Sequence, residues 1–339
     1  MKEGPSPPDV EVSPGARAGS QTLLILATPL PVRLLNAHVG GPRRLPDLRE
    51  QLGWPPQSTL RAALAHLRDI GALARHQVPG APYTVLNELT EAGRELLSVA
   101  GLLKAWLAEA PGGPIEPDAN LAKGTVRALA QGWSMGILRS LTSEPATLTE
   151  LHRLIPSTSY PSLERRLAAM RAAVLVEPVT TTGRGTPYRA TEWLRRSVGP
   201  ICGAARWEEQ HLVTHEVVGL TGEDVSAILQ LTLSLPLPLP VHADGRCLLA
   251  APSGSAAVRG GLTGLMVELQ RGRVVSCVAQ LDSAPPTWAL GTPAQWLETL
   301  LTGDPGNLRV GGHDPQLAAN LAQALSFAIF RSQIASIDQ

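Results

Sequence analysis

The chain is poor in cysteine, lysine and aromatic residues, and the first two of these scarcities are informative. Its 339 residues include three cysteines, Cys202, Cys247 and Cys277, which lie too far apart to form a CxxC metal or redox motif. A reduced cytoplasm is therefore the compartment that we expect. Only three lysines occur against 26 arginines, which indicates a GC-rich genome and no function. No run of about 18 apolar residues is present, so we expect no membrane partner.

Signatures of enzymes and cofactors are also missing. The sequence contains no GxSxG nucleophile elbow and no P-loop, and Gly260, Gly261 and Gly264 do not complete a GxGxxG pattern. His211 and His215 are four residues apart and could share one helix face as metal ligands. No third ligand is evident, and a solvated helix end explains the pair. We therefore expect no enzyme activity, no metal and no cofactor.

The charges balance overall but are unevenly distributed. The net charge is zero, with 29 basic and 29 acidic residues. Residues 121–210 hold 12 basic against 7 acidic side chains, whereas residues 220–339 hold 6 against 9. A nucleic-acid partner must therefore be bound by the front of the chain.

One stretch of the chain occurs twice. Residues 58–71 (STLRAALAHLRDIG) and 161–174 (PSLERRLAAMRAAV) each place leucines or methionine along one helix face and arginines elsewhere. The resemblance extends without a gap at an offset of 103 residues. The matching pairs are Leu35 and Leu138, Pro42 and Pro145, Leu45 and Leu148, Leu48 and Leu151, Leu60 and Leu163, Leu64 and Leu167, Arg68 and Arg171. This is a duplicated domain, because solenoid repeats have periods of 20 to 50 residues.

Each copy predicts three helices followed by a β-hairpin, which is a winged helix-turn-helix. In the first copy we expect helices near 31–39, 46–52 and 58–70, and strands at 72–76 and 83–86. The second copy predicts strands at 174–179 and 188–191 around a Gly-rich tip. A helix follows each hairpin, at 89–110 and at 192–214, the latter broken near Gly199 and Pro200.

A third domain starts near Thr221 and mixes helices with strands. TGEDVSAILQLTL is typical of a capped helix, RCLLAA, LTGLMVEL and VVSCVAQL are typical of strands, and two more helices follow. The fold class is therefore α+β, with two tandem winged helix-turn-helix domains followed by an α+β domain. The boundaries that we expect are a disordered tail at 1–20, domains at 21–110, 121–218 and 219–339, and a linker at 111–120.

The basic helices and hairpins are the strongest functional signal. A helix fits the major groove of DNA, and an arginine on a wing can enter the minor groove. Single arginines are more simply explained as solvated surface, but their joint recurrence in both copies favours DNA. The candidate contacts are Ser58, Thr59, Arg61 and Ala62 in the first copy, Tyr160, Ser162, Arg165 and Arg166 in the second, and Arg184 at the wing tip.

Residues 30–106 resemble the HxlR-type winged-helix regulators. The motifs are GPRRLxxL (Gly41 to Leu48), STLxxxLxxLxxxG (Ser58 to Gly71) and LTEAGREL (Leu89 to Leu96). The resemblance implies DNA contact by Arg43 and Arg44, and dimerisation through terminal helices. Leu45 replaces the family's usual Phe. The second copy has Glu144, Ala146 and Thr147 where Gly41, Arg43 and Arg44 stand, which implies weaker phosphate contact there. Two copies in one chain would form a covalent pseudo-dimer, and a second chain is a further candidate partner.

The C-terminal part is similar to the sterol carrier protein type 2-like fold. The similarity rests on Trp288 to Pro305 (WALGTPAQWLETLLTGDP) and Leu308 to His313 (LRVGGH). That family encloses an apolar cavity, which implies an apolar small-molecule effector. The cavity-wall candidates, each of which could equally be core, are Val267, Leu269, Val278, Leu281, Trp288, Trp296 and Phe327.

The sequence thus predicts a cytoplasmic transcriptional regulator that binds double-stranded DNA, with a C-terminal domain that senses a ligand or contacts a partner. The main alternative is a protein-interaction scaffold, because winged helices also bind proteins and the chain lacks the net positive charge common in DNA-binding proteins. An enzyme is the third interpretation and would need a polar cluster in the third domain that the sequence does not contain.

Overall fold

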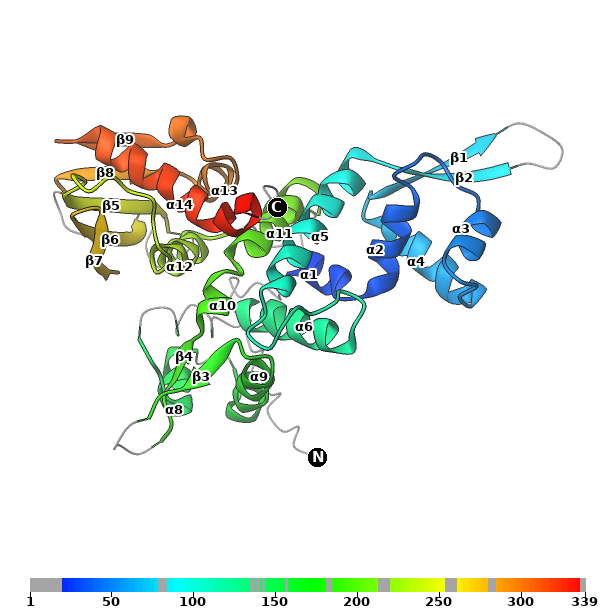
Figure 1. Ribbon diagram of the computed structural model, residues 1–339, viewed down its shortest axis with the longest axis horizontal. Coiled ribbons are helices and arrows are strands. Elements are labelled where there is room, and N and C mark those ends of the chain that lie inside the picture. The colour runs from blue at the N-terminus through cyan, green and yellow to red at the C-terminus, as the bar shows by residue number, and fades with distance from the viewer. Residues whose placement is uncertain are drawn as a thin grey trace, which may run out of the picture.

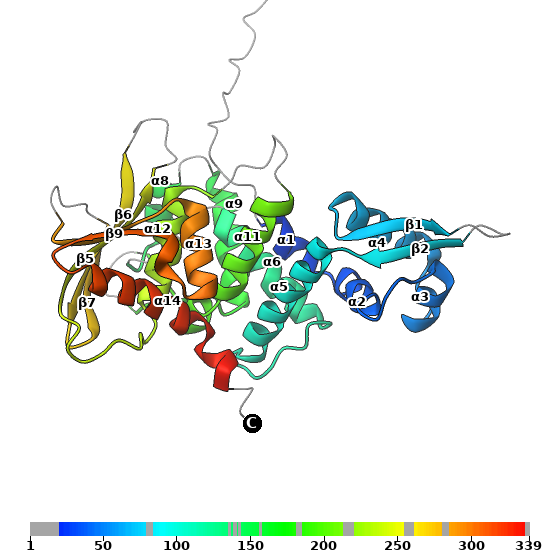
Figure 2. The same cartoon turned by 90° about the horizontal axis from the view of Figure 1, so that it is seen from above.

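A computed structural model describes residues 20–78, 84–134, 137, 141, 144–155, 158–180, 185–212, 220–253, 261–279 and 285–335. We call residues 20–110 the first unit, 120–212 the second unit and 220–335 the third unit. Figures 1 and 2 place the hairpin and short helices of the first unit at one end of the molecule and the sheet of the third unit at the other. Long helices of the first two units pack together between them.

The first unit contains the three helices and the hairpin that the sequence predicts. A short helix α1 (Gln21–Leu26) precedes α2 (Pro29–Ala37), α3 (Leu45–Gln51) and α4 (Gln57–Asp69). Strand β1 (Leu73–Val78) pairs antiparallel with β2 (Thr84–Leu89), and α5 (Glu91–Ala108) follows. Leu60, Leu64 and Leu67 of α4 are buried as the apolar stripe requires, so the opposite face of α4 is left to solvent.

The second unit repeats this order. It contains α6 (Asn120–Ser134), α8 (Leu148–Leu154), α9 (Tyr160–Ala172), the strands β3 (Val176–Pro178) and β4 (Tyr188–Ala190), and the helices α10 (Glu192–Arg195) and α11 (Val198–His211). The contacts that link the elements recur as well. The hydroxyl of Thr90 donates to the carbonyl of Gly71 at 2.7 Å, and that of Thr191 donates to Val174 at 2.9 Å. A β-bridge joins Arg43 to Asn87 in the first unit and Ala146 to Tyr188 in the second.

Two predicted boundaries in the second unit are shifted. The break in the last helix falls at residues 196 and 197, because Pro200 lies in the first turn of α11, where its missing N–H removes no helix bond. The first strand begins at Val176 instead of Val174. Val174 has a left-handed φ of 56°, at the position where the first unit has Gly71 with φ 74°.

Helix α5 of the first unit and α10–α11 of the second pack in opposite directions. The indole of Trp106 donates to the carbonyl of Trp193 at 2.9 Å, and that of Trp207 donates to Ala92 at 2.7 Å. Trp207 follows Trp106 by 101 residues, and Trp193 follows Ala92 by the same number. After the hairpins the offset between the units is 101 instead of 103, because the second hairpin is two residues shorter than the first. The two hydrogen bonds are therefore exchanged between equivalent positions of the two units.

Polar side-chain pairs lie at both ends of the same packing. Glu95 contacts His211 at 2.7 Å between carboxylate and imidazole, and Arg196 contacts Glu109 at 3.2 Å. Position 196 is the equivalent of 95, so the two units place opposite charges at the same site. Near the middle, a Cβ on Gly203 would lie 2.9 Å from Leu102, its own equivalent. The small Gly203 of the second unit thus packs against the large Leu102 at the equivalent position of the first unit.

The third unit is a five-stranded sheet with helices on one face. The strands are β5 (Gly245–Pro252), β6 (Leu262–Gln270), β7 (Arg273–Val278), β8 (Thr287–Leu290) and β9 (Arg309–Gly312), in the order β7-β6-β5-β8-β9. Only the β5–β8 pair is parallel among the described pairings. Helices α12 (Gly222–Leu233), α13 (Pro293–Thr302) and α14 (Pro315–Ala335) form the core with one face of the sheet. Strands β8 and β9 were not predicted from the sequence.

The third unit is joined to α11 by packing and by charge. Helix α13 lies against α11, and Arg206 contacts Glu298 at 3.3 Å. Among the helices of the described ranges, none is both long enough and apolar enough to cross a membrane.

Candidate nucleic-acid interface

The N-terminal end of α4 exposes the residues predicted to read DNA. The helix begins at Gln57, and Pro56 before it supplies no side-chain cap, so the first backbone N–H groups have no side-chain partner there. Ser58, Thr59 and Arg61 are exposed on this end. Free N–H groups and the helix dipole favour an anion such as phosphate at such a position.

A basic groove lies between α4 and the hairpin of the first unit. Its volume is about 480 Å³, and Arg61, Arg68 and Arg75 line it together with Leu45, Leu64, Ala65, Val85 and Asn87. Arg61 and Arg68 are two helical turns apart and therefore share one face of α4. Arg68 donates to the side-chain oxygen of Asn87 at 3.3 Å, which fixes it against β2. No acidic side chain is among the described residues that line the groove.

Arg68 and Arg75 were not among the sequence candidates. Arg68 was noted as part of the repeat, and its spacing of seven from Arg61 was the signal that could have placed it beside the reading face. Arg75 lies on β1, and only the pairing of the hairpin against α4 brings it to the groove.

The two arginines of the turn before α3 have different environments. Arg43 is half-buried, and its Nε donates to the carbonyl of Ala37 at 3.2 Å, so it holds the end of α2. Arg44 is exposed at the start of α3, and its backbone N–H faces the carboxylate of Asp47 at 3.4 Å. The guanidinium of Arg44 is the freer of the two to reach a phosphate.

The second unit carries a different set of side chains on the equivalent helix. Tyr160 begins α9, is 42% exposed and meets the ring of His152 edge-on at 5.5 Å. Arg165 is exposed, while Ser162 and Arg166 are half-buried. Glu164 stands where the first unit has Arg61, and Pro178 stands where it has Arg75. Of the three groove arginines, only Arg68 has an arginine, Arg171, at the equivalent position. Arg184, the predicted wing-tip contact, lies outside the described residues.

The predicted cavity-wall residues are not brought around one cavity. Val267, Leu269 and Trp296 are buried in the core between the sheet and its helices, where the Trp296 indole donates to Ala250 at 2.9 Å. Trp288 lies on the opposite face of the sheet, because side chains alternate along a strand. Val278 and Phe327 are 46% and 49% exposed, and Leu281 lies outside the described residues.

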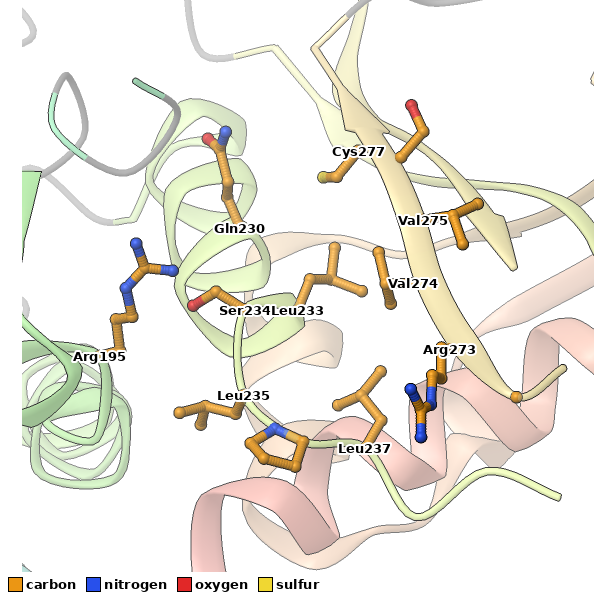
Figure 3. Close-up of a pocket in the computed structure, with 13 residues that line it drawn as sticks. Arg195, Gln230, Leu233, Ser234, Leu235, Leu237, Arg273, Val274, Val275 and Cys277 are labelled. Carbon is orange, nitrogen blue, oxygen red and sulfur yellow. The ribbon is translucent and has the colours of Figure 1, made fainter. Parts of the chain in front are cut away.

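A groove of about 720 Å³ lies elsewhere on the third unit (Figure 3). It runs between the end of α12, the segment 234–237 and the edge strand β7, and Arg195 of the second unit forms one of its sides. Sequence reasoning missed this groove because its sides are far apart along the chain.

Of the two histidines considered as metal ligands, His211 contacts a carboxylate, and His215 lies outside the described residues. His211 contacts Glu95, and the buried carboxylate of Glu208 accepts from the Ser20 hydroxyl at 2.6 Å and the Thr22 N–H at 2.9 Å. Within the described ranges, no three His, Cys, Asp or Glu side chains could hold a metal ion. Burial raises the pKa of Cys202 and Cys247 to about 12 and that of Cys277 to about 11, so these thiols are protonated and poor nucleophiles at neutral pH.

Residues 31–111 match the family model described as HxlR-like helix-turn-helix. The first unit is thus similar to the HxlR-like helix-turn-helix family. The match spans α2 to the end of α5, including the basic groove, and this family suggests a DNA-binding transcription regulator. No curated protein matches the chain.

Proposed function

We propose that the protein is a cytoplasmic DNA-binding transcription regulator in which α4 and α9 are the two reading helices of a pseudo-dimer within one chain. The observation that carries the proposal is the pair of exchanged hydrogen bonds, Trp106 to Trp193 and Trp207 to Ala92. In a two-fold interface, residue i contacts j and j contacts i. The α5–α11 packing follows this rule with an offset of 101, as expected if a dimer of identical units had become one chain.

The DNA-binding face of the first unit is centred on α4. Ser58, Thr59 and Arg61 would meet the base edges, while Arg44, Arg68 and Arg75 would meet phosphates beside them. The proposal is supported by the exposure of the helix end and by the acid-free groove of the described residues. Arg43 would contribute to DNA binding mainly by holding the end of α2, since its Nε donates to the carbonyl of Ala37.

The second unit would contact DNA through a weaker and different surface. The proposed contacts are Tyr160, Ser162, Arg165, Arg166 and Arg184. Glu164 would repel phosphate at the position where Arg61 attracts it. The two half-sites of the DNA should therefore differ in sequence.

The test is selection of duplex DNA from a random pool by the full chain, followed by affinity measurements at several salt concentrations. A regulator should retain one sequence class, and log K should fall linearly with log salt, by about 0.9 for each neutralised phosphate. Enrichment of no sequence, with retention that salt does not change, would contradict the proposal.

The second candidate is a protein-interaction scaffold, and the zero net charge favours it. The same selection separates the two functions, because a scaffold would leave the pool unenriched.

We further propose that the third unit, near 219–339, adjusts DNA binding in response to a small molecule. The sterol-carrier resemblance motivates this role, but its predicted wall residues do not surround one cavity, so the candidate site is the exposed groove beside Arg195.

A further inference from the structure

The groove of about 720 Å³ is built from two units of the chain. Its floor and far wall are Leu233, Leu235, Leu237 and Val274, from the end of α12, the segment after it and β7. Figure 3 shows the Arg195 side chain reaching from α10 toward Gln230 of α12 and Ser234 just after it. A volume of this size fits a drug-sized molecule, since ligand pockets measure about 300 to 1,000 Å³.

Positive charge in the groove is not balanced locally. Arg195 and Arg273 line it, and no Asp or Glu does so among the residues that the structure describes. Arg195 is half-buried, and within the described ranges its guanidinium has no ion-pair or hydrogen-bond partner, whereas its backbone N–H donates to Thr191. The nearest carboxylate on the same helix, Glu192, is paired with Arg196 at 2.5 Å.

The environment of Arg195 disfavours its charge. Burial lowers the pKa of Arg195, and the cation of Arg189 on β4 lowers it further, while Glu192 partly opposes the shift. An anion in the groove would stabilise the charged form of Arg195, because an opposite charge at hydrogen-bond distance favours the guanidinium cation.

We propose that the groove binds a small amphipathic monocarboxylic acid, with its carboxylate paired to Arg195 and its apolar body lying along Leu235 and Val274. A flat guanidinium fork binds a carboxylate through two parallel hydrogen bonds, and the aliphatic wall removes the rest of the ligand from water. This site deepens the sensing role proposed above, and the binding itself does not depend on that role.

The position of Arg195 gives the ligand a route to the DNA-binding part. Arg195 ends α10, which follows β4 of the second hairpin after a single residue, Thr191. A ligand that bridges Arg195 to α12 and β7 would hold this hairpin to the third unit. It alters DNA affinity only if it binds the free and DNA-bound forms unequally.

The first experiment is calorimetric titration of the full chain, without DNA, with decanoate and 4-butylbenzoate as probes and methyl decanoate as the uncharged analogue. We expect at least one acid to bind and the ester not to bind. Arg195→Gln should weaken acid binding about ten- to one-hundred-fold, as expected for a lost charge-assisted hydrogen bond. Arg195→Lys should keep part of the affinity.

The matched control is Arg206→Gln, which removes an arginine outside the groove that pairs with Glu298. Thermal unfolding of each variant reports whether it is folded. Absence of binding by both acids, equal binding of acid and ester, or equal loss in Arg195→Gln and Arg206→Gln would overturn the proposal. DNA retention of the ligand-free Arg195→Gln chain is measured separately, so failure of the site and failure of DNA binding give different results.

Discussion

At the scale of single residues, arginine placement distinguishes the two units more than any other feature. Arg61, Arg68 and Arg75 converge on one groove in the first unit, whereas the equivalent positions of the second unit hold Glu164, Arg171 and Pro178. The two units share the order of their elements, but the side chains of the proposed reading face differ. Substitutions on α4 and α9 should therefore have unequal effects on DNA binding.

Replacing Arg61 with Ala should weaken specific DNA binding by about 1 to 3 kcal/mol if the guanidinium contacts a base edge. Fluorescence anisotropy with the selected duplex measures the change. Arg94→Ala is the matched control, because Arg94 is exposed on α5 and pairs with Glu91 away from the groove. Equal losses in Arg61→Ala and Arg94→Ala would mean that only total charge matters.

Glu164→Ala should strengthen binding, and a weakening would contradict the assignment of α9 to the DNA face.

Glu208 joins α1 to α11, and its loss should destabilise the fold. Its buried carboxylate accepts from Ser20 and from the N–H of Thr22 at the start of α1, where a negative charge is favoured. Glu208→Gln removes the charge and should lower the free energy of unfolding by about 1.5 to 3 kcal/mol, measured by urea denaturation. Glu209→Gln, the next residue along α11, is the control. An unchanged unfolding midpoint for Glu208→Gln would show that this contact does not hold α1.

At the scale of elements, the two units differ at the turn that leads from α4 or α9 into the hairpin. Gly71 adopts a left-handed φ of 74° there, a conformation that is easy for glycine, while Val174 adopts φ 56° at the same place. A β-branched residue in this region is strained.

Val174→Gly should therefore stabilise the protein by up to about 1 kcal/mol, since relief of strain exceeds the added entropy of the unfolded chain. Val174 is 47% exposed, so little burial is lost. The reverse change, Gly71→Val, should destabilise. Differential scanning calorimetry of both variants tests the pair, and a lower midpoint for Val174→Gly would show that the backbone is not strained at this turn.

The packing of α5 on α11 gives a second prediction for elements. Trp106→Phe and Trp207→Phe each remove an indole N–H and leave a carbonyl, of Trp193 or Ala92, without its donor. Each should lower the free energy of unfolding by about 1 to 3 kcal/mol and weaken DNA binding by loosening the two units. Trp54→Phe is the control, because Trp54 is 63% exposed. A fully stable Trp106→Phe or Trp207→Phe would remove the main support for the pseudo-dimer.

Much of the element pattern could be predicted because it follows from local rules. The leucine spacing of α4 and the capping of α12 by Thr221 and Asp224 each determine a nearby element. Strands β8 and β9 escaped prediction because each has four residues and β9 contains two glycines, which have low strand propensity. The grooves were not predicted either, since Arg195 and Val274 line the same groove only after the units pack.

At the scale of the whole molecule, the central claim is that one chain contains both halves of a DNA-binding dimer. The exchanged tryptophan bonds, and the side-chain contacts that the equivalent residues Glu95 and Arg196 each make across the packing, support a fixed intramolecular arrangement. A homodimer remains a separate proposal, and nothing in the described α5–α11 packing requires a second chain. Because the two reading helices carry different side chains, the DNA site should not be a perfect inverted repeat.

The most direct test is native mass spectrometry of the complex with the shortest selected duplex, combined with hydroxyl-radical footprinting of both strands. The account predicts one chain per duplex and two protected segments about one helical turn apart, with different sequences. Because α4 and α9 would each cover one segment, Arg61→Ala should weaken the protection of one segment before the other. Two chains on a perfect inverted repeat, or a single protected segment under a single chain, would contradict it.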